Sequence, residues 1–385
     1  MSDMQQRFSE DWDRKIRGVV EELHRNPVFH MGLASKELFH SNFLGWLFGE
    51  SPDTAEIVLG EWLRPDKKQV KFLVQQEYEH LDLVVRVPGF APVVIENKLF
   101  KTLSPNQLLG YNDKLQQPES ELQGSTRIAL TLLGPENGQE YLGWSCHRFD
   151  ELVSPLEEVV RQMNSGSFEQ QLLERYIRVL GLLTEFRDLL DFQHENEVID
   201  FWLDYPLSLE PEKWNDYAKK VRYANVAFSL QQAHPASGDV TYRFDWSRTH
   251  PLVECFFLEN SGEHEIGWQL QDSNFKAAVR LATGGPTKRS YEKPGTPENR
   301  RKAREEFANR HFSLWFQPLP EFHDLTVEAE SPIFRERASG SGGGLFYGYA
   351  PDFVDRRANM PRLTFHDLAI LHGAYARHAR FGVQG

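Results

Sequence analysis

The chain has 385 residues, 40% of them apolar, and a formal net charge of −13. Its length fits two or three domains, and its apolar content excludes wholesale disorder. No apolar run approaches about 20 residues, so we expect no membrane span. The charged N-terminus lacks an apolar signal core, and two cysteines cannot form a disulfide framework, which indicates a reducing cytoplasm. The negative charge argues against a protein that coats polyanions indiscriminately.

Three helices are expected before residue 64. Residues 1–26 predict a polar helix with a narrow apolar stripe, which ends at Asn26 because the residue before a proline avoids helical dihedrals. A second helix is expected to begin near Ser35, a plausible N-cap, and to run to Phe48. Its positions 37, 41, 44 and 48 share one face. A short helix follows at 53–63.

A change of periodicity at Val70 predicts strands. Residues 70–75 alternate, and segments 80–87 and 92–99 are rich in β-branched residues. The intervening Pro88-Gly89-Phe90 predicts a hairpin. The pattern then predicts a helix at 105–115, a strand at 126–133 and helices at 155–164 and 168–192.

An acidic segment marks the expected domain boundary. Residues 185–216 hold ten acidic and two basic side chains, and we expect the boundary near 192–197. Beyond it the pattern predicts strands at 224–231, 240–246, 252–258 and 264–271, and helices at 297–310 and 365–380. Residues 286–310 hold eight basic and four acidic side chains. This segment is either a solvated helix face or, with the arginines near the glycine-rich stretch 339–344, a phosphate-contacting surface.

Asp82, Glu96 and Lys98 form the pattern with the clearest chemistry. Glu96 and Lys98 are two apart in a predicted strand, so they share a face of the sheet. A three-residue loop makes residues whose numbers sum to 178 face each other, which sets Asp82 opposite Glu96 with Cβ atoms about 4.5–5.5 Å apart. Two carboxylates this close repel unless a cation lies between them. Mg²⁺ suits such a pair, because it binds few carboxylates and keeps several waters.

Lys98 adds a positive charge beside the two carboxylates. It could stabilise negative charge that develops on an oxygen, as hydrolysis of a phosphodiester requires. The alternative is an exposed edge-strand salt bridge, which contributes little. The apolar flanks of both strands favour interior strands, where unpaired charge is costly. Gln107 and Tyr111, four apart on the next helix, share one of its faces.

Four motifs therefore follow one another along the chain. They are the helix ELFHSNFLGWL with Glu37, the strand HLDLVV with Asp82, the strand VVIENK with Glu96 and Lys98, and the helix QLLGY with Gln107 and Tyr111. In this order they resemble the PD-(D/E)XK nuclease superfamily over about residues 30–150. The last motif is similar to the QxxxY element of RecB-like members. Leu81 stands where the name-giving proline can occur, and Asn97 where many members have an apolar residue.

The resemblance implies a role for each of these residues. Asp82 and Glu96 would bind Mg²⁺, with Mn²⁺ as an alternative ion, and the carbonyl of Asn97 would add an oxygen ligand. Lys98 would be the catalytic lysine, and Glu37 would complete or support the metal site. Gln107 and Tyr111 would support the site or contact nucleic acid. Two further candidates are Ser41, as a packing group near Glu37, and His80, as a neighbour of Asp82 on the same face of the sheet.

The expected fold is α/β. Residues 1–195 would form a restriction-endonuclease-like domain, a central mixed sheet flanked by helices, with its core at about 30–150 and helices to about 192. Residues 196–385 would form an α+β accessory domain, which could contact a second copy or a protein partner. The resemblance implies a Mg²⁺-dependent nuclease, a DNA endonuclease of bacterial anti-phage defence or DNA processing. The alternative is a nuclease-fold protein that binds nucleic acid or a protein partner without cleaving.

Other motifs carry less chemistry. His40 and Ser41 are adjacent on a helix and point in different directions, so they cannot act as a base and nucleophile pair. Glu77 and Glu79 are either solvated charges or further ligands. Cys146-His147 has no partners at zinc spacing and is expected in the core. The run 283–288 lacks the spacing of a phosphate-binding loop.

Overall fold

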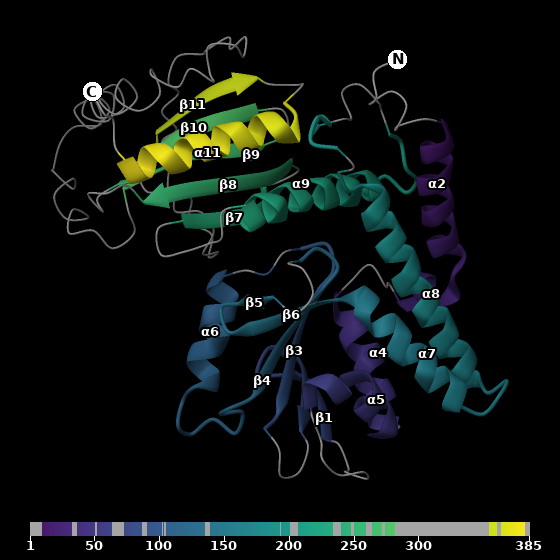
Figure 1. Cartoon of the computed structure of the whole chain (residues 1–385). Coiled ribbons are helices and arrows are strands. Elements are labelled where there is room, and N and C mark those ends of the chain that lie inside the picture. Colours follow the sequence, from purple (N-terminus) through teal and green to yellow (C-terminus); the bar gives the residue numbers. More distant parts are fainter. Residues whose placement is uncertain are drawn as a thin grey trace, which may run out of the picture. The chain divides into compact units, whose positions relative to one another are not determined.

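The computed structural model describes most of the N-terminal half of the chain and parts of the C-terminal half (Figure 1). The described residues are 10–32, 37–50, 52–63, 73–86, 91–101, 103, 105–134, 139–192, 194–200, 207–233, 240–247, 250–258, 264–271, 274–281, 354–359 and 363–381. Contacts divide the chain into two compact units. The first is Met1–Asp191 with Leu207–Ala224, and the second is Phe192–Pro206 with Asn225–Gly385. Residues 207–224, which we expected in the accessory domain, thus belong to the first unit.

The described part of the first unit begins with four helices. Helix α2 (Glu10–Arg25) buries the whole predicted stripe of Trp12, Ile16, Val19, Val20 and Leu23. A short helix that we did not expect, α3 (Pro27–Gly32), follows at once. The side chain of Asn26 explains it, because its Oδ1 accepts a hydrogen bond from the N–H of Val28 (3.0 Å) and so acts as an N-cap. Helices α4 (Glu37–Glu50) and α5 (Pro52–Leu63) match the predicted ones, while Ser35 lies outside the described residues.

A six-stranded mixed sheet forms the centre of this unit. Its strands are β1 (Leu73–Tyr78), β2 (Leu81–Arg86), β3 (Val93–Lys98), β4 (Thr126–Thr131), β5 (Glu140–Tyr141) and β6 (Trp144–Arg148), in the order β1-β2-β3-β4-β6-β5. The predicted hairpin register is confirmed, because the β2–β3 pairs Leu83↔Ile95, Val84↔Val94 and Val85↔Val93 all sum to 178. Strand β3 also pairs parallel to β4, so it is an interior strand. Strands β5 and β6 were not predicted.

Helices cover both faces of the sheet. Helix α6 (Pro105–Leu115) has the predicted bounds and packs through Leu108, Tyr111 and Leu115 on an apolar cluster that includes Val94 and Trp144. Helix α4 covers the opposite face, where Gly45 allows the close approach to β1. A Cβ at this position would lie 2.2 Å from the side chain of Gln76. The 3-10 helix η1 (Phe149–Leu152), α7 (Val153–Gln162) and α8 (Phe168–Leu189) complete the unit.

Helix α9 (Lys213–Ala233) corrects one prediction, because it contains the segment 224–231 that we expected as a strand. The alternation of Ala224, Val226, Phe228 and Leu230 suggested a strand. The buried residues between Ala218 and Leu230 instead lie on most sides of this helix. No glycine or proline interrupts it. Its first half, to Ala224, belongs to the first unit and its second half to the second unit.

The second unit contains an antiparallel five-stranded sheet in the order β11-β10-β9-β8-β7. The predicted strands β7 (Val240–Ser247), β8 (His250–Leu258) and β9 (His264–Gln271) and helix α11 (Phe365–Phe381) are confirmed. Strands β10 (Asn274–Leu281) and β11 (Val354–Asn359) were not predicted. The whole basic segment 286–310 with its expected helix 297–310, the run 283–288 and the glycine-rich stretch 339–344 lie outside the described residues.

In the described part of the chain, no helix is long and apolar enough to cross a membrane. Cys146 and Cys255 are both buried, and neither forms a disulfide.

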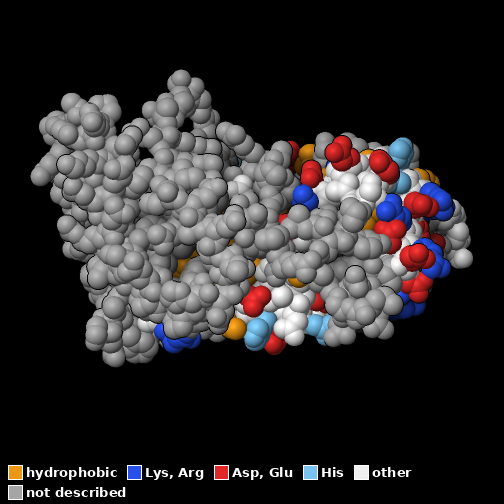
Figure 2. All heavy atoms as spheres, turned by 90° about the horizontal axis from the view of Figure 1, so that it is seen from above, with side chains coloured by type: hydrophobic (Ala, Val, Ile, Leu, Met, Phe, Trp, Pro, Cys, Tyr) orange, Lys and Arg blue, Asp and Glu red, His pale blue; other side chains and the backbone are white. Residues whose placement is uncertain are grey.

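The described surface carries mixed charge. Figure 2 shows acidic and basic side chains beside one another. The pairing of Arg178 with Glu22, 2.5 Å apart, is typical of this mixture.

Candidate active site

Two neighbouring strands and one helix position the predicted carboxylates and lysine. The β2–β3 pairs end at Leu83 and Ile95, so Asp82 and Glu96 follow directly in the register. There the Asp82 side chain turns to β3, and its Oδ2 accepts a hydrogen bond from the main-chain N–H of Asn97 at 2.7 Å. Asp82 thus extends the strand pairing by one bond through its side chain. Glu96 and Lys98, two apart on β3, share a face of the sheet as expected.

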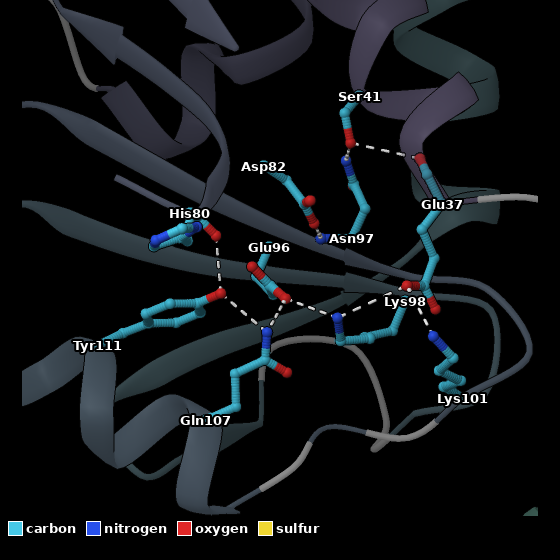
Figure 3. A network of polar contacts seen from close by, with 10 residues as sticks. All are labelled: Glu37, Ser41, His80, Asp82, Glu96, Asn97, Lys98, Lys101, Gln107 and Tyr111. Atoms are coloured by element: carbon cyan, nitrogen blue, oxygen red, sulfur yellow. Dashed lines mark hydrogen bonds and ion pairs between the residues drawn. The ribbon is translucent and has the colours of Figure 1, made fainter. Parts of the chain in front are cut away.

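Glu96 lies at the centre of the site (Figure 3). Its side chain is buried, with 1% of the residue exposed. Oε1 accepts hydrogen bonds from Lys98 Nζ at 2.6 Å and from Gln107 Nε2 at 2.8 Å. Oε2 is buried and has no hydrogen-bond partner. A buried carboxylate oxygen without a partner is unusual, because it retains the full cost of leaving water.

Gln107 and Tyr111 connect Glu96 to the turn between β1 and β2. Gln107 Nε2 also contacts the hydroxyl of Tyr111 at 2.8 Å, and that hydroxyl donates to the carbonyl of His80 at 2.8 Å. The expectation that His80 shares a face of the sheet with Asp82 is wrong, because His80 lies in the turn with a φ of 71°. It reaches this network through its main chain, not through its imidazole (Figure 3).

Glu37 approaches the site from the start of α4. Its Oε2 lies 3.7 Å from Lys98 Nζ and 3.6 Å from Lys101 Nζ, so one carboxylate bridges two ammonium groups. Lys101 was not among the predicted site residues, although its position three residues after Lys98 was a usable signal. Glu37 thus contacts the two lysines of the site.

Ser41 and Asn97 anchor β3 to α4. Asn97 Nδ2 donates to Ser41 Oγ at 2.7 Å, and Ser41 Oγ donates to the carbonyl of Glu37 at 3.3 Å. Asn97 alternates with Glu96 and Lys98 along β3, so its side chain is on the other face of the strand. This polar link holds the first turn of α4, and with it Glu37, at the end of β3.

Burial and neighbouring charges shift the titration of the whole cluster. Burial raises the pKa of Glu96 to about 7, against the opposing attraction of Lys98. Burial also raises the pKa of Asp82, while the hydrogen bond from Asn97 opposes this shift. For Lys98, burial alone would lower the pKa, but attraction by Glu96 and Glu37 outweighs it and the pKa is raised. Asp82 and Glu96 thus resist ionisation, while Lys98 retains its proton. A further cation would suit this site, because it would stabilise both carboxylates in their charged form.

The donor set fits a hard divalent cation. Asp82 and Glu96 offer carboxylate oxygens, and Glu96 Oε2 is an oxygen for which the protein supplies no donor. Within the described residues, no group of three or more His, Cys, Asp or Glu side chains could hold a metal ion. Two carboxylates fit Mg²⁺ better than Zn²⁺, because Mg²⁺ keeps several of its waters and Zn²⁺ prefers nitrogen and sulfur ligands.

A second polar network lies on β6 and η1, where Cys146-His147 was expected only as part of the core. Ser145 Oγ lies 2.9 Å from His147 Nε2, and His147 Nδ1 lies 2.8 Å from Glu151 Oε2. The order serine, histidine, carboxylate is that of nucleophilic hydrolases. Glu151 also accepts a hydrogen bond from the N–H of Arg148 at 2.9 Å. Capping of η1 therefore accounts for the position of the Glu151 carboxylate. We assign a structural role to the contacts among Ser145, His147 and Glu151.

Comparison with known proteins leaves the chain without an assigned relative. No family model, no curated protein and no solved structure matches it.

Proposed function

We propose that this chain is a Mg²⁺-dependent nuclease that hydrolyses phosphodiester bonds, with DNA as its substrate. The restriction-endonuclease-like fold is part of this proposal. The observation that carries it is the buried Glu96 carboxylate, which has one oxygen bound to Lys98 and Gln107 and the other without a partner. A protein that needed only a structural ion pair at this place would leave no carboxylate oxygen unsatisfied.

Each residue of the cluster would have a separate task. Asp82 and Glu96 would hold the ion, with the Asn97 carbonyl as a further ligand, and the ion would supply Lewis-acid chemistry at the phosphate. Lys98 would hold its proton and stabilise negative charge on the reacting phosphate, since its raised pKa keeps it charged at neutral pH. Glu37 and Gln107 would orient Lys98 and Glu96, and Tyr111 would fix Gln107.

Cleavage of plasmid and linear DNA tests this proposal directly. The full chain is incubated with Mg²⁺, with Mn²⁺ or with EDTA, and the wild type is compared with Asp82→Ala and Lys98→Ala. The matched controls are Asp113→Ala and Lys114→Ala, which remove the same charges from exposed positions of α6. We expect metal-dependent cutting by the wild type and by both controls. Each variant of the proposed site should lose about 100- to 1,000-fold in rate.

Two outcomes would count against the site. Equal metal-dependent cutting by all five proteins would exclude it. DNA binding without cutting under every metal condition would favour the alternative, a nuclease-fold protein that binds without cleaving.

A further inference from the structure

The N-terminal half of α9 packs against the segment that leaves β3 and carries a further lysine there. Trp214 is fully buried, and its ring lies 4.9 Å from that of Phe186 and 6.0 Å from that of Phe100, measured between centroids. Tyr217 stacks on Phe100 at 3.9 Å with an angle of 6° between the rings. Phe100 is two residues after Lys98, so these contacts hold α9 against the segment that leaves β3.

Lys220 follows Tyr217 by three residues and therefore lies on the same side of α9. Its Nζ lies 5.7 Å from the centroid of the Tyr217 ring. It is close enough to Lys101 and Glu37 for their charges to affect its titration. Lys98 and Lys101 pair with Glu37, and the stacking of Tyr217 on Phe100 places Lys220 beside the same segment, although it comes from a helix more than a hundred residues away in sequence.

Lys101 and Lys220 both bring positive charge to the segment that follows β3. Glu37 is a single carboxylate, and its contact with Lys101 is a weak one, because the Lys101 side chain is 71% exposed. Burial lowers the pKa of Lys220, and repulsion by Lys101 lowers it further, while Asp216 and Glu37 oppose this. Two lysines that repel each other beside a carboxylate site are stabilised when an anion binds between them.

We propose that Lys101 and Lys220 together bind a phosphate group of the nucleic-acid backbone, next to the phosphate that would react at Glu96 and Lys98. The inference rests on the proposed nuclease function for its ligand. Lysines bind phosphate as point charges and carry no base specificity, so this contact holds the strand in place and does not select a sequence. Both residues are positioning residues, because they would hold a neighbouring phosphate and would not contact the phosphate that reacts at Glu96.

The salt dependence of DNA binding tests this inference. The full chain, in EDTA to prevent cutting, is titrated with a short fluorescein-labelled DNA duplex at several NaCl concentrations. The variants are Lys101→Gln, Lys220→Gln, their combination and Lys220→Arg. The matched control is Lys213→Gln, which removes an exposed lysine of the same helix that lies near His24. Thermal unfolding of each variant checks that α9 keeps its place.

Each lost phosphate contact should reduce the slope of log K against log salt by about 0.9. We expect this reduction for each single glutamine variant, about twice as much for the double variant, and none for Lys213→Gln or Lys220→Arg. In cleavage, kcat/KM of the double variant should fall chiefly through KM, because the contact is equally strong before and during reaction. A double variant with the slope of Lys213→Gln would overturn the inference.

The two proposals can fail separately. If the wild type cuts DNA but the lysine variants keep its salt slope, the phosphate contact is wrong and the nuclease proposal stands. If the lysine variants lower the salt slope but the wild type cuts no DNA, the nuclease proposal is wrong and the phosphate contact stands. Absence of DNA binding by the wild type would overturn the phosphate contact.

Discussion

The Asp82 carboxylate accepts a hydrogen bond from the main-chain N–H of Asn97, 2.7 Å away, at the point where the β2–β3 ladder ends. One side chain therefore has a structural bond and, in our proposal, a chemical task. Asp82→Asn separates the two, because an amide oxygen can still accept this bond but carries no charge. We predict a stability equal to or above that of the wild type, since burial raises the pKa of Asp82, together with about a 100-fold or greater loss of cleavage.

Asp82→Ala is the companion variant, because it also removes the acceptor. The N–H of Asn97 then has no side-chain partner, and we expect a loss of about 1–3 kcal/mol in the free energy of unfolding. Urea unfolding and DNA cleavage, measured on both variants, distinguish the two roles. Full activity in Asp82→Asn would show that the charge of Asp82 is not needed.

Glu96 should make the metal-free protein less stable as the pH rises. Its pKa is about 7 in the folded protein against 4.5 ordinarily, so the folded state holds this proton more tightly than the unfolded state. The stability from this group is complete below pH 4.5 and is lost as the pH rises through 7. Glu96→Gln removes the titration and should be more stable than the wild type at pH 8 by an amount on the order of 3 kcal/mol. Urea unfolding in EDTA at pH 5 and pH 8 measures the difference, which should nearly vanish at pH 5.

Mg²⁺ should reverse this effect. A ligand that binds only the folded protein raises its stability by about 2.7 kcal/mol at 100 times its Kd. We predict that Mg²⁺ raises the melting temperature of the wild type at pH 8 and raises that of Glu96→Gln and Asp82→Asn much less. Differential scanning calorimetry with and without EDTA measures these shifts. Equal shifts in all three proteins would place any bound Mg²⁺ elsewhere.

His24 should give the opposite pH dependence. Trp214 Nε1 donates a hydrogen bond to His24 Nε2 at 2.8 Å, which requires that nitrogen to be unprotonated. Burial lowers the pKa of His24, and the charges of Lys213 and His30 lower it further. Below pH 6.5 the unfolded chain therefore binds a proton that the folded chain resists, and stability falls as the pH falls.

His24→Gln should flatten this part of the stability profile, because the amide oxygen still accepts from Trp214 but does not titrate. Urea unfolding of both proteins between pH 5 and pH 8 tests this prediction. An unchanged slope below pH 6.5 would assign the effect to another group.

The turn between β1 and β2 carries removable backbone strain. Glu79 and His80 have φ values of 53° and 71°, in a region that glycine adopts at low cost. His80→Gly should raise the free energy of unfolding by roughly 1 kcal/mol. The carbonyl bond to Tyr111 should remain, because it belongs to the main chain. As a control, Gln75→Gly within β1 should lower stability, since its dihedrals are those of a strand. A loss of stability in His80→Gly would show that the imidazole contributes packing.

Much of the first unit could be predicted from local sequence. The loop at 88–90 and the apolar flanks were sufficient to fix the β2–β3 register, and the spacing of Gln107 and Tyr111 indicated a shared helix face. The helix at 213–233 could not be recognised in the same way. Its buried residues, from Ala218 to Leu230, are spread around most of its circumference, so the sequence shows no single apolar stripe of helical period. Packing, not local propensity, decides its structure.

The site was predictable to the extent that it depends on β2 and β3. The hydrogen bond from Asn97 to Asp82, and the bridge of Glu37 to Lys101, depend on side-chain directions that strand periodicity does not determine. Lys220 could not be associated with the site at all, because residues 207–224 were expected in the other domain. Only the packing of Trp214 and Tyr217 brings this lysine to the end of β3.

Trp214 also affects how this protein can be divided. The chain passes between the two units after Asp191, before Leu207 and after Ala224. A fragment that stops near residue 195 would contain every residue of the Glu96 cluster, yet would leave Phe100 and Phe186 uncovered. Residues 207–224 of the first unit follow residues 192–206 of the second unit along the chain. If the C-terminal region is deleted or exchanged with a boundary inside the acidic segment, the N-terminal unit thus loses part of its hydrophobic core.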